Sequence, residues 1–341
     1  MVIVHKDNKC YELPDGVEYK NHLAPALWGL YSPKFEEILK SNDIPYKLTD
    51  YADYSDKYEL EGDYFIGRFA QAYEDSTKHS CCFDRLYDFY GENMWPNKKT
   101  YYYYDDKIRQ LELLKKYNRH IPSIVCNDLD ELLKNVTVGT VVKSTHGAGS
   151  ESIFYVWEKE HLDNLEIYIS DITSKDWIDN NFFPCVVQEY IDFEWEYIIF
   201  STSNEVYGYK RMLPKDWNSP NSFPYNSFHG DWTAFSYNDK RGNRFRTNDT
   251  VLDKKELDSD LIEFIRDVKN ELNTPNLKFD MINGKVVEFS YIYNEIMPYV
   301  GGPMYFSYNI HLNIIEEKRK PLAYFQYEQI NSVLKHLGII K

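Results

Sequence analysis

The first hundred residues alternate short apolar runs with polar loops. Residues 1–5 form one apolar run, residues 34–48 show helical spacing, and residues 62–69 form a second apolar run. The order strand, helix, strand indicates a small α/β unit with a partly parallel sheet. Residues 92–99, which include Pro96, predict a loop.

The pattern becomes more regular after residue 104. Asp105 or Asp106 is expected to cap a helix that runs to residue 118, with apolar side chains on one stripe. Patterns of the same kind predict an extended run over 121–128, a helix from Asp128, a strand, a glycine loop and a strand over 140–156, and a helical stretch over 159–169.

The second half of the chain predicts mostly strands. Three strands are expected over 185–191, 195–203 and 205–213, the last two joined at Asn204. A helix over 256–272, a hairpin over 277–292 that turns at Asn283-Gly284, and a closing helix over 328–338 follow. Residues 214–249 are polar and aromatic with little periodicity, and in a compact domain so long a segment is usually functional or disordered.

Composition limits the possible functions. The chain has 341 residues, of which 43% are hydrophobic, which is enough for two or three packed layers. It has no apolar run long enough for a membrane span and no secretory signal, so we expect a cytoplasmic protein with no membrane partner. The formal net charge of −15 argues against nucleic acid as a partner but not against ATP, whose site needs only a few local cations.

A lysine and a glycine-rich loop form the first candidate site. Lys143 ends an apolar run just before residues 145–150, where Gly147, Gly149 and Ser150 lie. The backbone N–H groups of such a loop can wrap phosphate oxygens, and a lysine adds positive charge. The Walker A and dinucleotide-binding patterns both fail to match. Taken alone, the loop also fits a purely structural hairpin.

Further candidate residues lie at strand ends. Gln188, Glu189, Tyr190 and Ile191 end a strand and could present groups to an adenine, while Glu196 could reach ribose hydroxyls. Each of these residues also fits an ordinary solvated position.

Two carboxylates and two arginines follow. Asp280 and Glu288 lie across the predicted Asn283-Gly284 hairpin, where two carboxylates suit one or two Mg²⁺ ions. Arg211 ends a strand, and Arg246 lies in the long polar segment. Lone arginines are usually surface residues of little energetic weight.

The order of these elements is more specific than any one of them. The series begins with a helix that carries a lysine, a strand with Lys143 and a glycine loop, and the segment QEYI. It continues with a strand that ends in Lys-Arg, the segment FRTN, a helix, and a hairpin with Asp on one strand and Glu on the other. This series resembles the ATP-grasp superfamily and, within it, the ribosomal-protein glutamate ligase type of carboxylate-amine ligases. The resemblance spans roughly residues 60 to 300.

The resemblance implies roles for individual residues. ATP would be bound by the lysines, the glycine loop, the adenine hinge and the ribose acid: Lys107, Lys143, Gly147, Gly149, Ser150, Gln188, Glu189, Tyr190, Ile191 and Glu196. Arg211 would meet the γ-phosphate, and Arg246 would lie over an acyl phosphate. The magnesium ligands would be Asp280 and Glu288, completed by Ser290 or Asn294 where the family has asparagine.

The resemblance also implies a fold and its boundaries. An N-terminal α/β (preATP-grasp) domain over 1–100 would be followed by two α+β subdomains that clasp ATP, over 101–185 and 186–341. The first of these subdomains would hold the glycine loop, and the second the metal and substrate residues.

The implied reaction is amide formation through an acyl phosphate, with ATP and Mg²⁺ as cofactors. The substrates would be small molecules, a carboxylate such as a sugar acid or small carboxylic acid and an amine, and the protein could form a homodimer. Ile198 stands where the glutamate ligases carry an arginine for the acyl acceptor, so a glutamate substrate is not implied. A kinase that phosphorylates a sugar or small alcohol on the same fold, and a degenerate ATP-binding regulator, are the alternatives.

Overall fold

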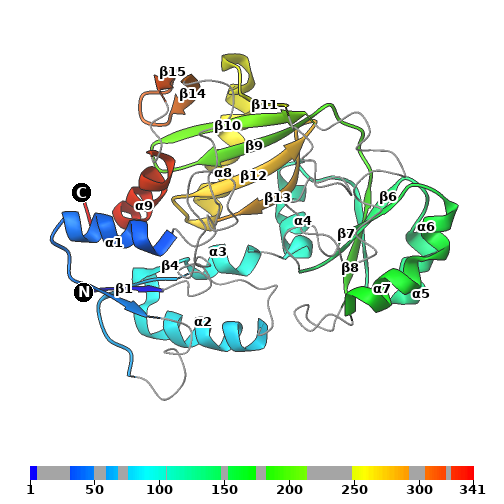
Figure 1. Ribbon diagram of the computed structural model, residues 1–341, viewed down its shortest axis with the longest axis horizontal. Helices are drawn as coiled ribbons and strands as arrows, with labels where there is room; N and C mark the ends of the chain where they lie inside the picture. Colours follow the sequence, from blue (N-terminus) through cyan, green and yellow to red (C-terminus); the bar gives the residue numbers. More distant parts are fainter. Residues whose placement is uncertain are drawn as a thin grey trace, which may run out of the picture.

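The computed structural model describes residues 1–5, 31–49, 59–67, 76–104, 106–146, 153–173, 182–212, 248–291, 304–319 and 324–341. Their strands form three sheets. In Figure 1 the large sheet lies above the N-terminal one, and the small sheet lies to one side of both. No helix within these ranges is long and apolar enough to cross a membrane.

The N-terminal sheet is parallel, with strand order β2-β1-β3-β4. Its elements are β1 (Val2–His5), α1 (Tyr31–Ser41), β2 (Tyr46–Thr49), β3 (Tyr64–Ile66), α2 (Ser76–Tyr90), the 3₁₀ helix η4 (Gly91–Asn93) and β4 (Met94–Trp95). Parallel strands need crossover connections, and α1 supplies the one between β1 and β2. The predicted α/β unit is therefore confirmed.

The loop predicted over residues 92–99 is partly wrong. Met94 and Trp95 pair with β3 as a short parallel strand, and both side chains are buried. Asn97 then caps helix α3 (Lys98–Tyr103), because its side chain accepts the Thr100 N–H at 2.8 Å. Burial of the apolar pair in the core outweighed the turn signal of Pro96.

The small sheet is antiparallel, with strand order β5-β8-β6-β7. Its strands are β5 (Ser123–Cys126), β6 (Thr140–Ser144), β7 (Ile153–Val156) and β8 (Cys185–Glu189). One face packs on three helices, α5 (Leu129–Asn135), α6 (Lys159–Asp163) and α7 (Leu165–Thr173). Strands alternate their side chains between faces, so Lys143 and Gln188 point to the other face, which we call the lysine face.

The large sheet has strand order β13-β12-β9-β10-β14-β15, with β11 also paired to β10. Its strands are β9 (Trp195–Ser201), β10 (Glu205–Met212), β11 (Asn248–Val251), β12 (Leu277–Ile282), β13 (Lys285–Ser290), β14 (Met304–Asn309) and β15 (Ile314–Arg319). The β9–β10 hairpin was predicted. The β14–β15 hairpin was not predicted.

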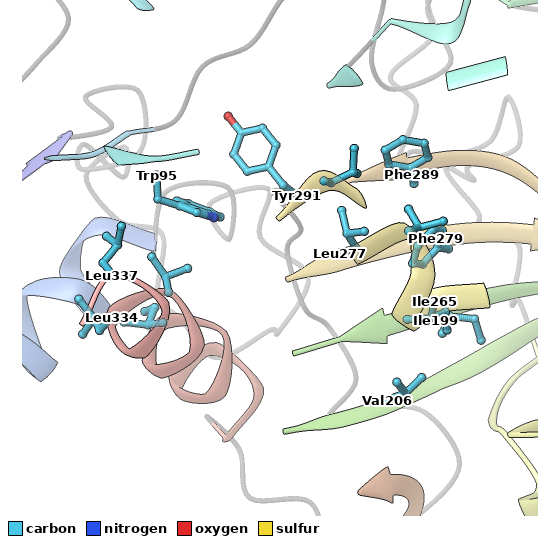
Figure 2. Packing of buried hydrophobic residues seen from close by; sticks show 14 of the residues in the cluster. Trp95, Ile199, Val206, Ile265, Leu277, Phe279, Phe289, Tyr291, Leu334 and Leu337 are labelled. Atoms are coloured by element: carbon cyan, nitrogen blue, oxygen red, sulfur yellow. The ribbon is translucent and has the colours of Figure 1, made fainter. Parts of the chain in front are cut away.

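The main core fills one face of the large sheet. Helix α8 (Ser259–Leu272), which follows the 3₁₀ turn η6 (Lys254–Glu256), lays its apolar stripe on this face. Figure 2 shows Ile265 of α8 against Ile199 and Phe279 of the sheet. Leu334 of the closing helix α9 (Tyr324–His336) packs near Trp95 of the N-terminal sheet. The same core thus joins the N-terminal and large sheets.

The opposite face of the large sheet carries Lys278, Asp280, Glu288 and Ser290, and we call it the carboxylate face. Cross-strand register places these four residues on one side of β12 and β13. The predicted turn between them is confirmed, because Asn283 and Gly284 have φ values of 46° and 74°. Two consecutive positive φ angles are typical of a type I′ hairpin turn.

The two boundaries between the three predicted domains remain predictions. The strand pairing bears on one of them, because β8 begins at Cys185 and pairs with β5 and β6 along its length. This pairing favours an end of the middle subdomain after Glu189.

Candidate active site

Helix α4 (Lys107–Lys116) places the first predicted lysine beside the small sheet. Asp106 caps the helix by accepting the Arg109 N–H at 2.9 Å, as predicted for Asp105 or Asp106. The backbone N–H of Lys107 donates to the carbonyl of Thr145 at 3.0 Å. Lys107 therefore starts its helix at the end of β6, the strand that carries Lys143.

Gln110 ties the same helix to the large sheet. Its Nε2 donates to the Phe289 carbonyl at 2.9 Å, and its Oε1 accepts the Phe289 N–H at 3.1 Å. Nε2 also donates to the carbonyl of Tyr103 at 3.0 Å. The side chain is 3% exposed, so these bonds form away from water, where unpaired groups are costly. Gln110 thereby holds the first turn of α4, which begins at Lys107, against β13.

Lys143 is buried on the lysine face and held by Gln188. Its Nζ donates to Gln188 Oε1 at 2.6 Å, and Gln188 Nε2 donates to Ser123 Oγ at 3.2 Å. Burial, and then the charge of Lys107, lower the pKa of Lys143 to about 8, while Glu288 acts in the opposite direction. Lys107 and Glu288, a predicted magnesium ligand, therefore both lie within electrostatic reach of Lys143.

A pocket lies where α4, the lysine face and β13 meet. It is lined by Lys107, Gln110, Leu111, Leu114, His120, Ile121, Ser123, Lys143, Val186, Gln188, Val286 and Val287. Apolar walls with a few convergent polar groups are typical of a small-molecule site. Lys107, Lys143 and Gln188 were each predicted to bind ATP, and the pocket brings them together.

Asp280 and Glu288 lie directly opposite each other on β12 and β13, as predicted. A register shift follows Asp280, so the hairpin is irregular next to the pair. Ser290 pairs with Lys278, one step along the same face. Among the residues that the structure describes, no cluster of three or more His, Cys, Asp or Glu forms a metal site, so a cation here would rely on this pair and on groups from its substrate.

Lys278 is a functional candidate that the sequence did not reveal. Its Nζ donates to Asp280 Oδ2 at 2.7 Å on the carboxylate face. Burial opposes its charge, but Asp280, followed by Tyr209 and Glu288, outweighs burial and raises the pKa of Lys278. The available signal was its position two residues before Asp280, which puts both side chains on one face of a strand.

Glu196 and Arg211 lie opposite each other on β9 and β10. Glu196 also pairs with Ile282, two residues beyond Asp280, so it lies on the carboxylate face with the predicted metal pair. Only the backbone of Arg211 is described, and its side chain is outside the described residues.

The predicted adenine hinge, Glu189 to Ile191, begins at the last residue of β8. The N–H of Glu189 donates to the Pro122 carbonyl and that of Tyr190 to the Gly139 carbonyl, each at 3.0 Å. The Tyr190 ring packs edge-on against Trp157 at 4.4 Å between ring centroids. Those two N–H groups therefore hold the hinge to the small sheet, and base contacts would fall to the carbonyls and to Ile191.

Several predicted residues fall outside the described residues. They are Gly147, Gly149 and Ser150 of the glycine loop, Arg246, and Asn294, the alternative metal ligand. Their roles stay predictions.

The sequence itself matches no protein-family model and no curated protein. Solved structures are similar to the whole chain. D-alanine–D-alanine ligase from Bacillus anthracis is 12% identical with a TM-score of 0.56, over 99% of this chain and 97% of that chain. D-cycloserine synthetase DcsG is 12% identical with a TM-score of 0.54, over 98% and 99%. The macrocyclase MdnC from Microcystis aeruginosa MRC, bound with precursor peptide MdnA, is 11% identical with a TM-score of 0.52, over the full length of both chains. Similarity at this identity shows a shared fold.

Proposed function

We propose that this chain, which has the ATP-grasp fold of these proteins, is an ATP-dependent carboxylate-amine ligase that uses Mg²⁺. The observation that carries the proposal is the convergence of Lys107 and Lys143 with Glu288 between the small and large sheets. Proteins on one fold can differ in chemistry, so the site must support the function that the fold suggests.

Lys107 and Lys143 would bind the phosphates of ATP. The pKa of Lys143 is lowered because Glu288 does not fully offset burial and Lys107, and among the described residues its hydrogen-bond acceptor is the neutral amide of Gln188. An anionic phosphate placed beside it would stabilise its positive charge, which favours binding. Val186 and Val287 supply apolar surface for a base in the same pocket.

Asp280 and Glu288 would hold the metal, with Ser290 adjacent on the same face. The donor set fits Mg²⁺, which takes oxygen ligands and shares them with phosphates. Lys278 supports this fit, because its ammonium already occupies a cation position against Asp280. When bound, Mg²⁺ neutralises charge on the transferring phosphoryl group.

The proposed reaction needs no nucleophilic side chain. An oxygen of the substrate carboxylate attacks the γ-phosphorus of ATP, and the bond from that phosphorus to the bridging β,γ-oxygen breaks. ADP departs, and the substrate is now an acyl phosphate. An amine then attacks the acyl carbon, loses a proton, and expels inorganic phosphate to give an amide. Lys278, Arg211 and Arg246 are proposed to stabilise the negative charge of these two steps.

The names of the similar proteins agree with a joining reaction, because they include a ligase, a synthetase and a macrocyclase. We propose a sugar acid or another small carboxylic acid as the acyl donor and a small amine as the acceptor. One of the similar proteins was solved with a peptide. A substrate screen should therefore include peptides with acidic side chains.

The test combines nucleotide binding with chemical trapping. The protein is incubated with MgATP, a panel of carboxylates and hydroxylamine, which captures an acyl phosphate as a hydroxamate. Hydroxamate and ADP that appear together, and only with a carboxylate, support the ligase. ADP formed with sugars or alcohols and without hydroxamate would instead establish a kinase. ATP binding without turnover of any panel member would favour a regulator. Glu288→Gln is the control that should bind ATP and form no hydroxamate.

A further inference from the structure

Most of the polar side chains that line the pocket already form hydrogen bonds within the protein. Gln110 bonds through both amide atoms to the backbone, and Gln188 bonds through both to Lys143 and Ser123. The Ser123 hydroxyl donates to the Ile121 carbonyl at 2.7 Å. Lys107 and Lys143 have ammonium groups, which donate and cannot accept.

His120 is the exception among these lining side chains. It lies between the end of α4 and the start of β5, and its Nδ1 is buried with no hydrogen-bond partner among the described residues. Burial, followed by the charges of Lys285 and Lys115, lowers its pKa, so the ring is neutral at pH 7. A neutral imidazole has one nitrogen that donates and one that accepts. The side chain is half-buried, so Nε2 can carry the proton toward solvent and leave Nδ1 as an acceptor.

A buried acceptor in a pocket of donors requires a ligand that donates. Phosphate oxygens cannot do so, because they only accept. An exocyclic amino group on a purine can, and His120 is next to the chain that holds the hinge, since the Pro122 carbonyl accepts the Glu189 N–H.

We propose that His120 selects the nucleotide base, its Nδ1 accepting a hydrogen bond from the 6-amino group of adenine. This inference rests on the proposed function, because it assigns a residue to the base of the same ATP. Guanine carries a carbonyl oxygen at that position, and this oxygen and Nδ1 of His120, both acceptors, could not form a hydrogen bond with each other. The site therefore prefers ATP to GTP.

The test removes each partner in turn. Binding of ATP and of purine riboside triphosphate, which lacks the 6-amino group, is measured by calorimetry with Mg²⁺ for the wild type and His120→Leu. The wild type should bind ATP about tenfold more tightly, as expected for one buried hydrogen bond. His120→Leu should lose most of that difference and bind the amino-free nucleotide as the wild type does. His120→Gln, whose amide oxygen still accepts, should keep part of the preference.

The outcomes separate this inference from the proposed function. The inference is overturned if the wild type binds both nucleotides equally, a result that requires no variant to fold. It is also overturned if the His120→Leu variant keeps the full ATP preference. In both cases hydroxamate formation by the wild type would still support the ligase. Wild-type protein that binds neither nucleotide would count against the ligase itself.

Discussion

Replacing Lys143 by methionine should stabilise the free protein while removing most of its affinity for ATP. The side chain is 6% exposed, and its pKa falls from the ordinary 10.5 to about 8. A difference of about 2.5 in pKa corresponds to about 3 kcal/mol spent at pH 7 on keeping a buried charge. Methionine keeps the unbranched shape but leaves Gln188 Oε1 without a donor, which costs about 1–2 kcal/mol. We therefore expect a net gain of about 1–2 kcal/mol in the free energy of unfolding.

The effect of pH follows from the direction of this pKa. Folded Lys143 releases its proton near pH 8, whereas the unfolded chain holds the proton up to about pH 10.5. Unfolding therefore takes up a proton between these values, and the contribution of Lys143 to stability rises with pH across that window. Buried Lys269, with a pKa lowered to about 7, behaves in the same direction but is common to both proteins. The advantage of Lys143→Met should thus be largest at pH 7 and smaller at pH 9.5.

Urea unfolding at the two pH values and calorimetry with MgATP test this reasoning. Lys143→Met should bind ATP about 10- to 100-fold more weakly, because the phosphates lose a charged hydrogen-bond donor. Lys134→Met, at an exposed position on α5, is the control and should change neither quantity. A variant less stable than the wild type at pH 7 would refute the assigned cost of the buried charge. Unchanged ATP affinity would refute the placement of the phosphates.

Other changes test the remaining parts of the site. Glu288→Gln should leave the melting temperature near that of the wild type, whereas Asp280→Asn should lower it, because Lys278 loses its counter-ion. Each should lower turnover by at least ~10²-fold, and near-normal rates in both would place the metal elsewhere. Arg246→Lys should keep calorimetric ATP affinity and lose most of the amide or hydroxamate product, because lysine cannot copy bidentate phosphate binding; wild-type product would remove Arg246 from the reaction. Gln110→Ala should lower the free energy of unfolding by about 2–4 kcal/mol in urea, since two buried backbone groups of β13 lose their partner, whereas exposed Glu112→Ala should change little.

Local patterns predicted the parts of the site that depend on neighbouring residues. The Asn283-Gly284 turn sets the first pairs of its hairpin, Ile282 with Lys285 and Met281 with Val286. The register shift after Asp280, which the sequence pattern did not reveal, is what places Asp280 opposite Glu288 and not opposite Val287. A cap at Asp105 or Asp106 could be predicted because a cap acts only three residues away, and the structure has it at Asp106.

Contacts between distant segments could not be predicted in this way. Gln110 and Phe289 are 179 positions apart, and nothing in the helical pattern around Gln110 indicates a sheet partner. The β14–β15 hairpin was missed for a different reason. Residues 304–309 have aromatic side chains on both faces, and their turn uses Asn313 at a φ of 53° in place of glycine.

The double attachment of α4 has a mechanical consequence. Lys107 bonds the start of the helix to the small sheet, and Gln110, one turn later, bonds it to the large sheet. Because both attachments lie within one turn of α4, the two sheets can rotate about that turn but resist separation there. Relative movement of the two sheets would then be a hinge-like swing with α4 as its axis. Such a swing changes the spacing between the sheets least beside Lys107 and most at the ends of the strands farthest from the helix.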